Sequence, residues 1–364
     1  MRRTSRQIHI GPVALGGAAP VVVQSMTKTD TEDVESTLRQ IRELADIGCE
    51  VVRLAVPHEE AASALPAIVA SSPLPLIADI HFNYRFALRA LEAGIHGLRL
   101  NPGNIGETWK VKEVVLASQS ARIPIRIGVN AGSLESDLKA SYRDDIPQAM
   151  VESALRQIRI LEDLGFEDTK ISLKASDVTT TVAAYRRIAE VCDYPLHLGI
   201  TEAGTAFTGT VKSSVGLGIL LAEGIGDTIR VSLAADPLEE VRVAYEILSA
   251  LGIRMRGVSI IACPTCGRLE FDMLTLVSRI EREIATLATP VKVAIMGCVV
   301  NGPGEAEEAD VGLAAGNGYA LLFKRGKIVS KIKEEEYFER LLEAIQEVVA
   351  EAEASSPEKS PLQN

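Results

Sequence analysis

The stretch PIRIGVN, at residues 124–130, alternates apolar and polar side chains at every position after its proline. One face carries Ile125, Ile127 and Val129, and the opposite face carries Arg126, Gly128 and Asn130. A period of two predicts a β-strand. The arginine indicates that one face meets polar groups while the other packs against apolar side chains. The fold therefore depends on how often this pattern recurs along the chain.

Short runs rich in Val, Ile and Leu recur before and after this stretch, and segments of helical length separate them. The further strand candidates are residues 20–26, 50–56, 75–82, 97–102, 169–176, 195–201 and 228–234. Eight βα units in a row predict an α/β fold of the (β/α)8 TIM-barrel type. A doubly wound sheet is disfavoured because no strand leads into a convincing G-x-G-x-x-G helix start.

The rhythm breaks near Gly252, and a second, smaller α/β unit follows. Its expected elements are a strand at 258–263, a helix at 274–287, a strand at 291–297, a loop, a strand at 319–332 and a helix at 334–353. We expect a barrel domain at residues 1–252, a second domain at 253–354 and a polar, disordered tail at 355–364. The first twenty residues are expected to form a hairpin across the bottom of the barrel.

Composition excludes several classes of function. A formal net charge of −11 argues against a general nucleic-acid or anionic-membrane surface, so any anion site must be built locally. The sequence has neither a signal-like apolar run near its start nor a stretch of membrane-spanning length. Five cysteines in 364 residues make a poor disulfide framework, which indicates a reducing compartment and a cytoplasmic protein.

The inward positions of the expected strands carry a concentration of charge. In the phase of Arg126 they are Arg53, Asp79, His81, Arg99, Asn130, Lys174, Arg230 and Ser232. Several cations in one interior are costly unless an anion neutralises them, and a phosphorylated ligand is the natural counterion. The Gly- and Thr-rich loop at 201–214 adds backbone amides where barrels commonly hold phosphate.

Each of these residues also has a structural alternative. A single inward arginine could pair with Asp79 or Glu202 and serve only the fold. His81, His197 and Thr201 are as compatible with packing as with substrate contact. Glu202 breaks the strand phase at its end, so it could face the pocket as an acid or hydrogen-bond partner.

Three of the five cysteines are spaced as ligands. Cys263 and Cys266 form a C-x-x-C pair, and Cys298 follows the next expected strand. The last histidine is His197, so a fourth ligand beyond residue 251 must be a carboxylate. We favour an iron–sulfur cluster over zinc, because a cluster with one non-cysteine ligand suits substrate chemistry at the odd iron.

The carboxylate candidates lie in one acidic run: Glu305, Glu307, Glu308 and Asp310. Glu305 directly follows the turn-forming sequence NGPG, which can bring it back beside Cys298. Glu307 and Glu308 are interpreted as part of a solvated loop. Cys49 and Cys192 fall inside the barrel pattern and are interpreted as core residues.

Nine motifs in order resemble one family, the flavodoxin- or ferredoxin-dependent 4-hydroxy-3-methylbut-2-en-1-yl diphosphate synthases of the two-domain bacterial type. They are VVVQSMTKTDT, ADIHFNY, LRLNPGNIG, IRIGVNAGSL, KISLKAS, LGITEAGT, IRVSLAADP, ACPTCGR and GCVVNGPGEA. The resemblance covers essentially the whole chain. It implies a TIM barrel followed by an iron–sulfur domain of the sulfite/nitrite reductase-like type, without the middle domain of some members.

The resemblance also implies a reaction and a partner set. The family opens the ring of 2-C-methyl-D-erythritol 2,4-cyclodiphosphate with two electrons and loss of water, in the methylerythritol phosphate pathway of isoprenoid biosynthesis. Ferredoxin or flavodoxin is the implied electron donor. The implied assembly is a homodimer in which the cluster domain of one chain covers the barrel of the other.

The family's site residues transfer to matching positions. Cys263, Cys266, Cys298 and Glu305 are the implied ligands of a [4Fe–4S] cluster. The implied diphosphate contacts are Arg53, Arg99, Arg126, Asn130, Lys174 and Ser232, and the residues implied at the reacting end are Asp79, His81, His197, Thr201, Glu202 and Arg230. Glu202 is the candidate for proton delivery or hydroxyl positioning.

Two alternatives from other classes stay open. One is a sirohaem-type sulfite or nitrite reductase, whose ligand cysteines are normally spaced as C-x5-C followed by C-x3-C. Here the first pair is C-x-x-C, and Gly302 occupies the position four residues after Cys298 where the last cysteine would be. The other alternative is a zinc-stabilised binding module attached to a phosphate-binding barrel.

Overall fold

The computed structural model describes residues 2–266, 269, 271–285, 287–298, 302–316 and 318–355. Most of the predicted tail, residues 356–364, lies outside this described part. The chain divides into two compact units between Arg254 and Met255. Within the described ranges, none of the helices has both the length and the apolar character that crossing a membrane requires.

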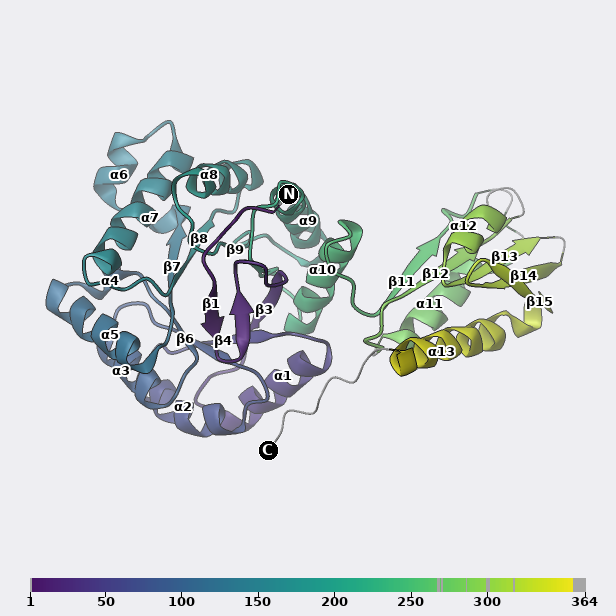
Figure 1. The fold of residues 1–364 in the computed structure, drawn as a ribbon, viewed down its shortest axis with the longest axis horizontal. Helices are drawn as coiled ribbons and strands as arrows, with labels where there is room; N and C mark the ends of the chain where they lie inside the picture. Colours follow the sequence, from purple (N-terminus) through teal and green to yellow (C-terminus); the bar gives the residue numbers. More distant parts are fainter. Residues whose placement is uncertain are drawn as a thin grey trace. The chain divides into compact units, whose positions relative to one another are not determined.

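The first unit is built on a parallel sheet of eight strands (Figure 1). The strands are β3 (Val22–Met26), β4 (Val51–Ala55), β5 (Leu76–Asp79), β6 (Gly97–Arg99), β7 (Ile125–Asn130), β8 (Thr169–Lys174), β9 (His197–Leu198) and β10 (Thr228–Ile229). The sheet order is β8-β7-β6-β5-β4-β3-β10-β9. A parallel bridge between Ile171 and Leu196 joins β8 to the residue before β9, so the sheet is nearly closed. The predicted TIM-barrel-like architecture is confirmed.

Helices surround this sheet (Figure 1). The long ones are α1 (Val34–Asp46), α2 (Glu59–Ser71), α3 (Tyr84–Glu92), α5 (Thr108–Ala121), α7 (Ile146–Glu162), α8 (Val178–Val191), α9 (Ala206–Ala222) and α10 (Pro237–Ala250). The short ones are α4 (Pro102–Ile105), α6 (Ser136–Ser141) and the 3-10 turn η1 (Ala131–Ser133). Outward strand residues such as Ile127 and Leu173 share one buried core with the helices. Because the apolar face of each strand is used by the helices, the charged face points into the barrel.

A hairpin closes the amino-terminal end of the barrel. It consists of β1 (Ile8–Ile10) and β2 (Val13–Leu15), paired antiparallel. Its apolar side chains form a separate cluster with Val22, Val51 and Ile77, which lie at or near the starts of three barrel strands. The carboxyl ends of the strands, where barrel enzymes hold their sites, are therefore left for polar groups.

The second unit is a five-stranded mixed sheet in the order β11-β12-β13-β14-β15. The strands are β11 (Val258–Ala262), β12 (Val291–Met296), β13 (Val311–Gly316), β14 (Tyr319–Lys324) and β15 (Lys327–Lys333), of which the first three are parallel. The helices are α11 (Met273–Ile284), α12 (Gly302–Glu308) and α13 (Tyr337–Ser355), with a 3-10 turn η2 (Glu334–Glu336). Helices α11 and α13 pack on one face of the sheet, and α12 packs on the other.

The structure corrects two expectations in this unit. Residues expected as a loop contain α12 and β13, so Glu307 and Glu308 are exposed residues of a helix. The single strand expected at 319–332 is a hairpin, whose turn at Arg325 and Gly326 has φ values of 48° and 75°. Positive φ at both central residues is typical of a tight β-hairpin turn.

Candidate functional site

Basic side chains from four strands and one strand end converge inside the barrel. They are Arg53 on β4, Arg99 on β6, Arg126 on β7, Lys170 and Lys174 on β8, and Arg230 directly after β10. Each is largely buried. Two buried carboxylates face them, Asp79 at the end of β5 and Glu240 on α10. The named cations therefore outnumber the named carboxylates.

Asp79 is the centre of the best-paired part of the interior. Its Oδ1 lies 3.1 Å from Arg99 Nη1, and its Oδ2 lies 3.4 Å from Arg53 Nε. Arg99 Nη1 also lies 3.2 Å from Nδ1 of the exposed His81. Burial raises the pKa of Asp79, but the attraction of the arginines outweighs this and lowers its pKa overall. Arg53 and Arg99 thus form the ion pairs with Asp79 that the structural alternative described, and Asp79 is a carboxylate at neutral pH.

Arg126 is incompletely paired, in contrast to Asp79 and its arginines. Arg126 is 2% exposed, and neither its Nε nor its Nη1 has a hydrogen-bond partner among the described residues. Burial, together with repulsion from Arg53 and Arg99, lowers the pKa of Arg126. An unpaired buried guanidinium is unfavourable. Its donors are therefore suited to an anion that enters the barrel.

Lys174 and His197 form a second buried pair. Lys174 Nζ lies 3.3 Å from His197 Nε2, and His197 Nδ1 contacts the Thr228 hydroxyl. Burial and the nearby Lys174 charge lower the pKa of His197, so the ring is neutral. A neutral ring can accept from Lys174 at Nε2 and donate to Thr228 at Nδ1. His197 thus fixes the position of the Lys174 amine.

Two glycines make room for these cations. A Cβ at Gly128 on β7 would lie 2.8 Å from Arg99 Nε. A Cβ at Gly199, directly after β9, would lie 2.6 Å from Lys174 Nζ and 2.7 Å from the Arg230 carbonyl oxygen. Backbone cannot yield as a flexible side chain can, so Gly199 is required for the close approach of β10 and Lys174.

The remaining predicted site residues lie at the carboxyl ends of the strands. Asn130 ends β7, Thr201 and Glu202 follow β9, and Ser232 follows β10. Glu202 is exposed and has a left-handed backbone, with φ of 52°. Non-glycine residues in this conformation cluster at functional sites. Glu202 forms no ion pair with the described residues, so the alternative in which it neutralises an inward arginine is not observed.

Sequence reasoning missed two interior residues. Lys170 is in the same phase as Ser172 and Lys174 and lies within the expected strand at 169–176, so the alternation could have identified it. Glu240 follows Glu239 in the first turn of α10. Its helical phase matches buried Val241 and Ala244, which was the available signal.

The three candidate cysteine ligands of the second unit follow two neighbouring parallel strands. Cys263 follows β11, Cys266 lies three residues later, and Cys298 follows β12. The register pairs Ala262 with Ile295, so both strand ends lie at one edge of the sheet. A Cβ on Gly297 would lie 3.4 Å from the Cys263 sulfur, which brings Cys263 next to the residue before Cys298. All three thiols are free of disulfide bonds.

Glu305 lies in the first turn of α12, the helix that follows β12. Its side chain is exposed. Ala306 and Ala309 pack against the sheet, so the carboxylates of α12 face away from it. Thr265, between Cys263 and Cys266, has φ of 50°, an outlier for a β-branched residue. This left-handed residue turns the C-x-x-C loop sharply between its two thiols.

A single-ion geometry is found elsewhere in the described part of the chain. Ligand atoms of the exposed residues Glu32, His58 and Glu60 lie within 4.8 Å of one another, whereas the three thiols and Glu305 do not form such a group. Three thiolates and one carboxylate are an uncommon ligand set for structural zinc, whereas thiolates are the usual ligands of iron–sulfur clusters, so the chemistry of these four residues fits a cluster better than one zinc ion.

The fold and the two sites define a class: a two-domain protein with a cation-lined TIM-like barrel and a small domain that presents three thiols and a carboxylate. The chain belongs to the GcpE family. The family model of the GcpE TIM-barrel domain matches residues 5–245, and that of the GcpE protein C-terminal domain matches residues 259–347.

Two close relatives carry the same name, 4-hydroxy-3-methylbut-2-en-1-yl diphosphate synthase (flavodoxin). The protein of Geobacter sulfurreducens is 58% identical, over 96% of this chain and 99% of its own length. That of Lawsonia intracellularis is 56% identical, over 96% and 98%. The family resemblance of the nine motifs is confirmed.

A solved structure resembles part of the chain. Dihydropteroate synthase from Stenotrophomonas maltophilia superimposes with a TM-score of 0.52 and 14% identity, over 68% of this chain and 98% of that one. At this identity the likeness shows a shared fold and nothing about function.

Proposed function

We propose that the chain is an iron–sulfur oxidoreductase that converts 2-C-methyl-D-erythritol 2,4-cyclodiphosphate to 4-hydroxy-3-methylbut-2-enyl diphosphate in the methylerythritol phosphate pathway. The name shared by relatives that are more than half identical over nearly the whole chain supports this activity. The observation that carries it from the structure is the buried, incompletely neutralised set of cations inside the barrel. A cyclic diphosphate supplies the missing negative charge.

The barrel, proposed as residues 1–252, is the substrate-binding domain. Arg53, Arg99, Arg126 and Lys174 bind the diphosphate oxygens, with Asn130 and Ser232 as hydrogen-bonding partners at the strand ends. Burial, with repulsion from Arg230 and Arg99, lowers the pKa of Arg53 to about 9, so Arg53 remains charged at neutral pH. Asp79 holds Arg53 and Arg99 in place, and His197 does the same for Lys174.

The reacting end of the substrate faces the mouth of the barrel, where we propose contacts with His81, Thr201 and Arg230. Glu202 is the proposed proton donor to the leaving hydroxyl, or its hydrogen-bond partner. Its exposure and left-handed backbone support a carboxyl group held toward the mouth. Asp79 is excluded as the donor because its lowered pKa keeps it ionised.

The second domain, proposed as residues 253–354, binds a [4Fe–4S] cluster through Cys263, Cys266, Cys298 and Glu305. The shared sheet edge of the strands before Cys263 and Cys298 and the left-handed Thr265 support this set. When bound, the cluster supplies electrons one at a time. A hard oxygen ligand binds a soft-ligand cluster less firmly than thiolate, so Glu305 is the corner that can open. We also propose the sulfite/nitrite reductase-like type for this domain.

The donor of these electrons is a flavodoxin-type protein, as the names of the relatives indicate, and a ferredoxin is the proposed alternative. Iron-ligating thiols must stay reduced, which supports a cytoplasmic location.

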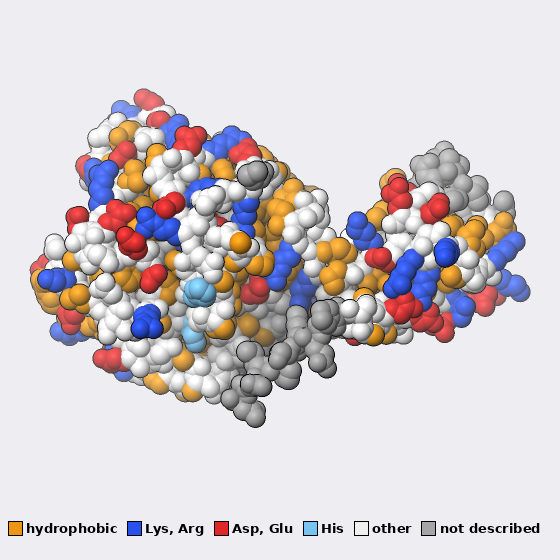
Figure 2. Space-filling view, viewed as in Figure 1, with side chains coloured by type: hydrophobic (Ala, Val, Ile, Leu, Met, Phe, Trp, Pro, Cys, Tyr) orange, Lys and Arg blue, Asp and Glu red, His pale blue; other side chains and the backbone are white. Residues whose placement is uncertain are grey.

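We propose that the protein acts as a homodimer, with the cluster domain of one chain over the barrel of the other. Helix α9 exposes Phe207, Val211, Val215 and Ile219 at intervals of four residues, which makes an apolar stripe on the barrel unit. Figure 2 shows hydrophobic side chains over this helix. An exposed stripe of this kind is typical of a protein–protein contact.

A complementation experiment tests the arrangement in trans. A chain with Cys298→Ser and a chain with Arg126→Met are each expected to be inactive, whereas a mixed dimer pairs one intact barrel with the intact cluster domain of the other chain. Restored turnover in the mixture supports the arrangement in trans. Mixed dimers that form but stay inactive would support action within one chain.

The activity itself is tested by anaerobic turnover of the cyclodiphosphate with a chemical reductant. We expect product from protein that contains iron and acid-labile sulfide in equal amounts, about four of each per chain for this cluster type. Zinc without sulfide, and no turnover, would support the zinc-stabilised binding module. Sirohaem absorbance bands would support the sulfite or nitrite reductase.

A further inference from the structure

Glu240 has been described so far only as a buried acidic side chain that faces the barrel cations. It projects from the first turn of α10 and is 2% exposed. Its Oε1 accepts a hydrogen bond of 3.0 Å from the Leu233 amide, and its Oε2 accepts one of 3.2 Å from the Ser25 hydroxyl. A buried carboxylate with backbone and hydroxyl donors on both oxygens is held in one orientation.

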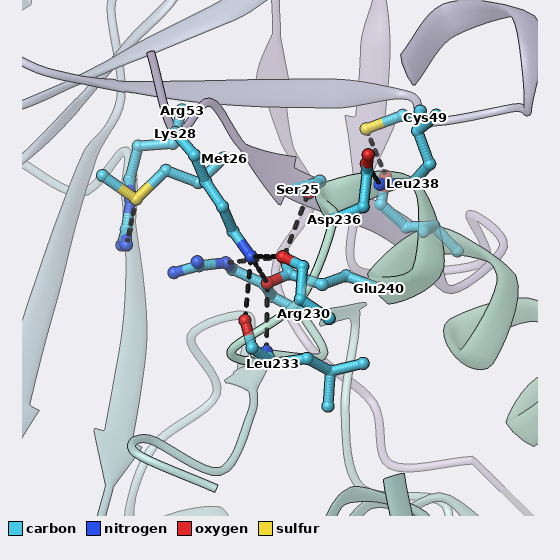
Figure 3. A network of polar contacts seen from close by, with 12 residues as sticks. Ser25, Met26, Lys28, Cys49, Arg53, Arg230, Leu233, Asp236, Leu238 and Glu240 are labelled. Atoms are coloured by element: carbon cyan, nitrogen blue, oxygen red, sulfur yellow. Dashed lines mark hydrogen bonds and ion pairs between the residues drawn. The ribbon is translucent and has the colours of Figure 1, made fainter. Parts of the chain in front are cut away.

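Two cations approach the same carboxylate. Lys28 Nζ lies 3.1 Å from Oε1, and Arg230 Nε lies 3.9 Å from Oε2 (Figure 3). Lys28 Nζ also donates to the carbonyl oxygens of Leu233, at 2.8 Å, and of Ala235. The ammonium group has three N–H donors; the two carbonyl oxygens accept from two of them, and the Glu240 carboxylate lies beside the ammonium group as its ion-pair partner. Lys28 is therefore committed to this network and is not free to bind substrate.

The network links segments that are far apart in the sequence. Ser25 lies on β3 and Lys28 follows β3, whereas Arg230 and Leu233 follow β10, the neighbouring strand in the sheet. Ser232 lies between Arg230 and Leu233. This segment carries two proposed substrate contacts. Glu240 lies near Arg230 at one end of it, and both Glu240 and Lys28 contact Leu233 at the other end.

We propose that Glu240 and Lys28 form a clamp that positions Arg230 and Ser232 for the substrate. This inference rests on the proposed function, because it assigns Arg230 and Ser232 to the substrate. Glu240 Oε2 lies too far from Arg230 Nε for a hydrogen bond, so Glu240 holds the guanidinium by ion-pair attraction, which leaves the terminal nitrogens for the ligand. Glu240 and Lys28 are positioning residues, since both act through the segment that they hold.

The test compares Glu240→Gln and Lys28→Met with Glu239→Gln, all in anaerobically purified full-length protein. Glu239 is the neighbour of Glu240 on α10, but its side chain is 45% exposed and pairs with Arg242 at the surface. We expect the KM for the cyclodiphosphate to rise about 10-fold or more in the clamp variants, as the loss of hydrogen bonds to charged groups implies. The kcat and the iron content of the clamp variants should change little. The Glu239→Gln variant should keep the KM of the unaltered protein.

The double variant gives a second readout. Because both residues hold the same segment, the effects of Glu240→Gln and Lys28→Met on KM should be far from additive. An unchanged KM with only a lower melting temperature overturns the proposal, since a purely structural role predicts that result. A decreased KM also overturns it, because Glu240 would then only neutralise Arg230. Absence of turnover in the unaltered protein would instead refute the proposed function.

Discussion

Arg126→Met is predicted to stabilise the ligand-free protein while it abolishes anion binding. Arg126 is buried with two N–H donors unpaired, and each such donor costs about 1–3 kcal/mol. Even buried ion pairs can be replaced by apolar side chains of similar volume with an effect that ranges from neutral to stabilising by about 1–4 kcal/mol. We take a gain of about 2 kcal/mol, which corresponds to a rise in Tm of roughly 4–8 °C for a unit of this size.

The assay is thermal unfolding of the full-length protein with and without inorganic pyrophosphate. At about 100 times its Kd, pyrophosphate should stabilise the unaltered protein by about 2.7 kcal/mol and should stabilise the variant much less. A higher free energy of unfolding together with weaker anion binding is expected for this substitution, because uncompensated buried cations destabilise the ligand-free protein but bind a ligand of opposite charge.

Arg99→Met is the matched control. Arg99 lies on the neighbouring strand and is also buried, and although its Nε lacks a partner among the described residues, its Nη1 pairs with Asp79 at 3.1 Å. Its loss leaves a buried carboxylate with Arg53 as its remaining arginine partner, so we expect destabilisation by about 3 kcal/mol. The reasoning is refuted if Arg126→Met lowers Tm as much as Arg99→Met, or if it retains the full shift with pyrophosphate.

Three further predictions concern other parts of the site. Burial lowers the pKa values of Lys174 and His197, so the unfolded chain binds more protons than the folded chain. The free energy of unfolding should therefore fall as pH falls, from about 10 downward for Lys174 and from about 6.5 downward for His197, by up to about 1.4 kcal/mol per pH unit and group. Lys174→Met should flatten the slope in denaturant titrations between neutral and alkaline pH, and an unchanged slope contradicts the assignment. Gly199→Ala should weaken pyrophosphate binding in calorimetry by about 1–3 kcal/mol through overpacking against Lys174 and the Arg230 carbonyl, and unaltered affinity would count against it. Glu305→Ala should retain iron and sulfide but lose turnover, whereas full activity removes Glu305 from the ligand set.

The barrel and its charged lining could be predicted because both follow from a period of two. Once PIRIGVN is a strand with Ile127 outward, Arg126 must point inward, and the same phase locates Arg53, Arg99 and Lys174. The pairing of inward arginines with Asp79 also follows from this rule. Neighbouring parallel strands bring their carboxyl ends together, so residues such as Asp79 and Arg99 meet without any local sequence signal.

The second unit was harder to predict because its strands give weaker signals. Strand β13 has the sequence VGLAAG and is buried along its whole length, so no polar residue marks an alternation. Helix α12 begins within a Gly- and Pro-containing stretch that is typical of a turn. Glu240 was missed for another reason. Only its helical phase relative to buried Val241 and Ala244 distinguishes it from the half-buried Glu239 beside it.

The stoichiometry of the reaction tests the central claim most directly. The reductant consumed and the 4-hydroxy-3-methylbut-2-enyl diphosphate formed are measured together in anaerobic assays of the full-length protein with the cyclodiphosphate. We predict one product molecule for each pair of electrons, and none from Arg126→Met. Oxidation of the reductant without product, in protein that carries its full content of iron and sulfide, would contradict the account.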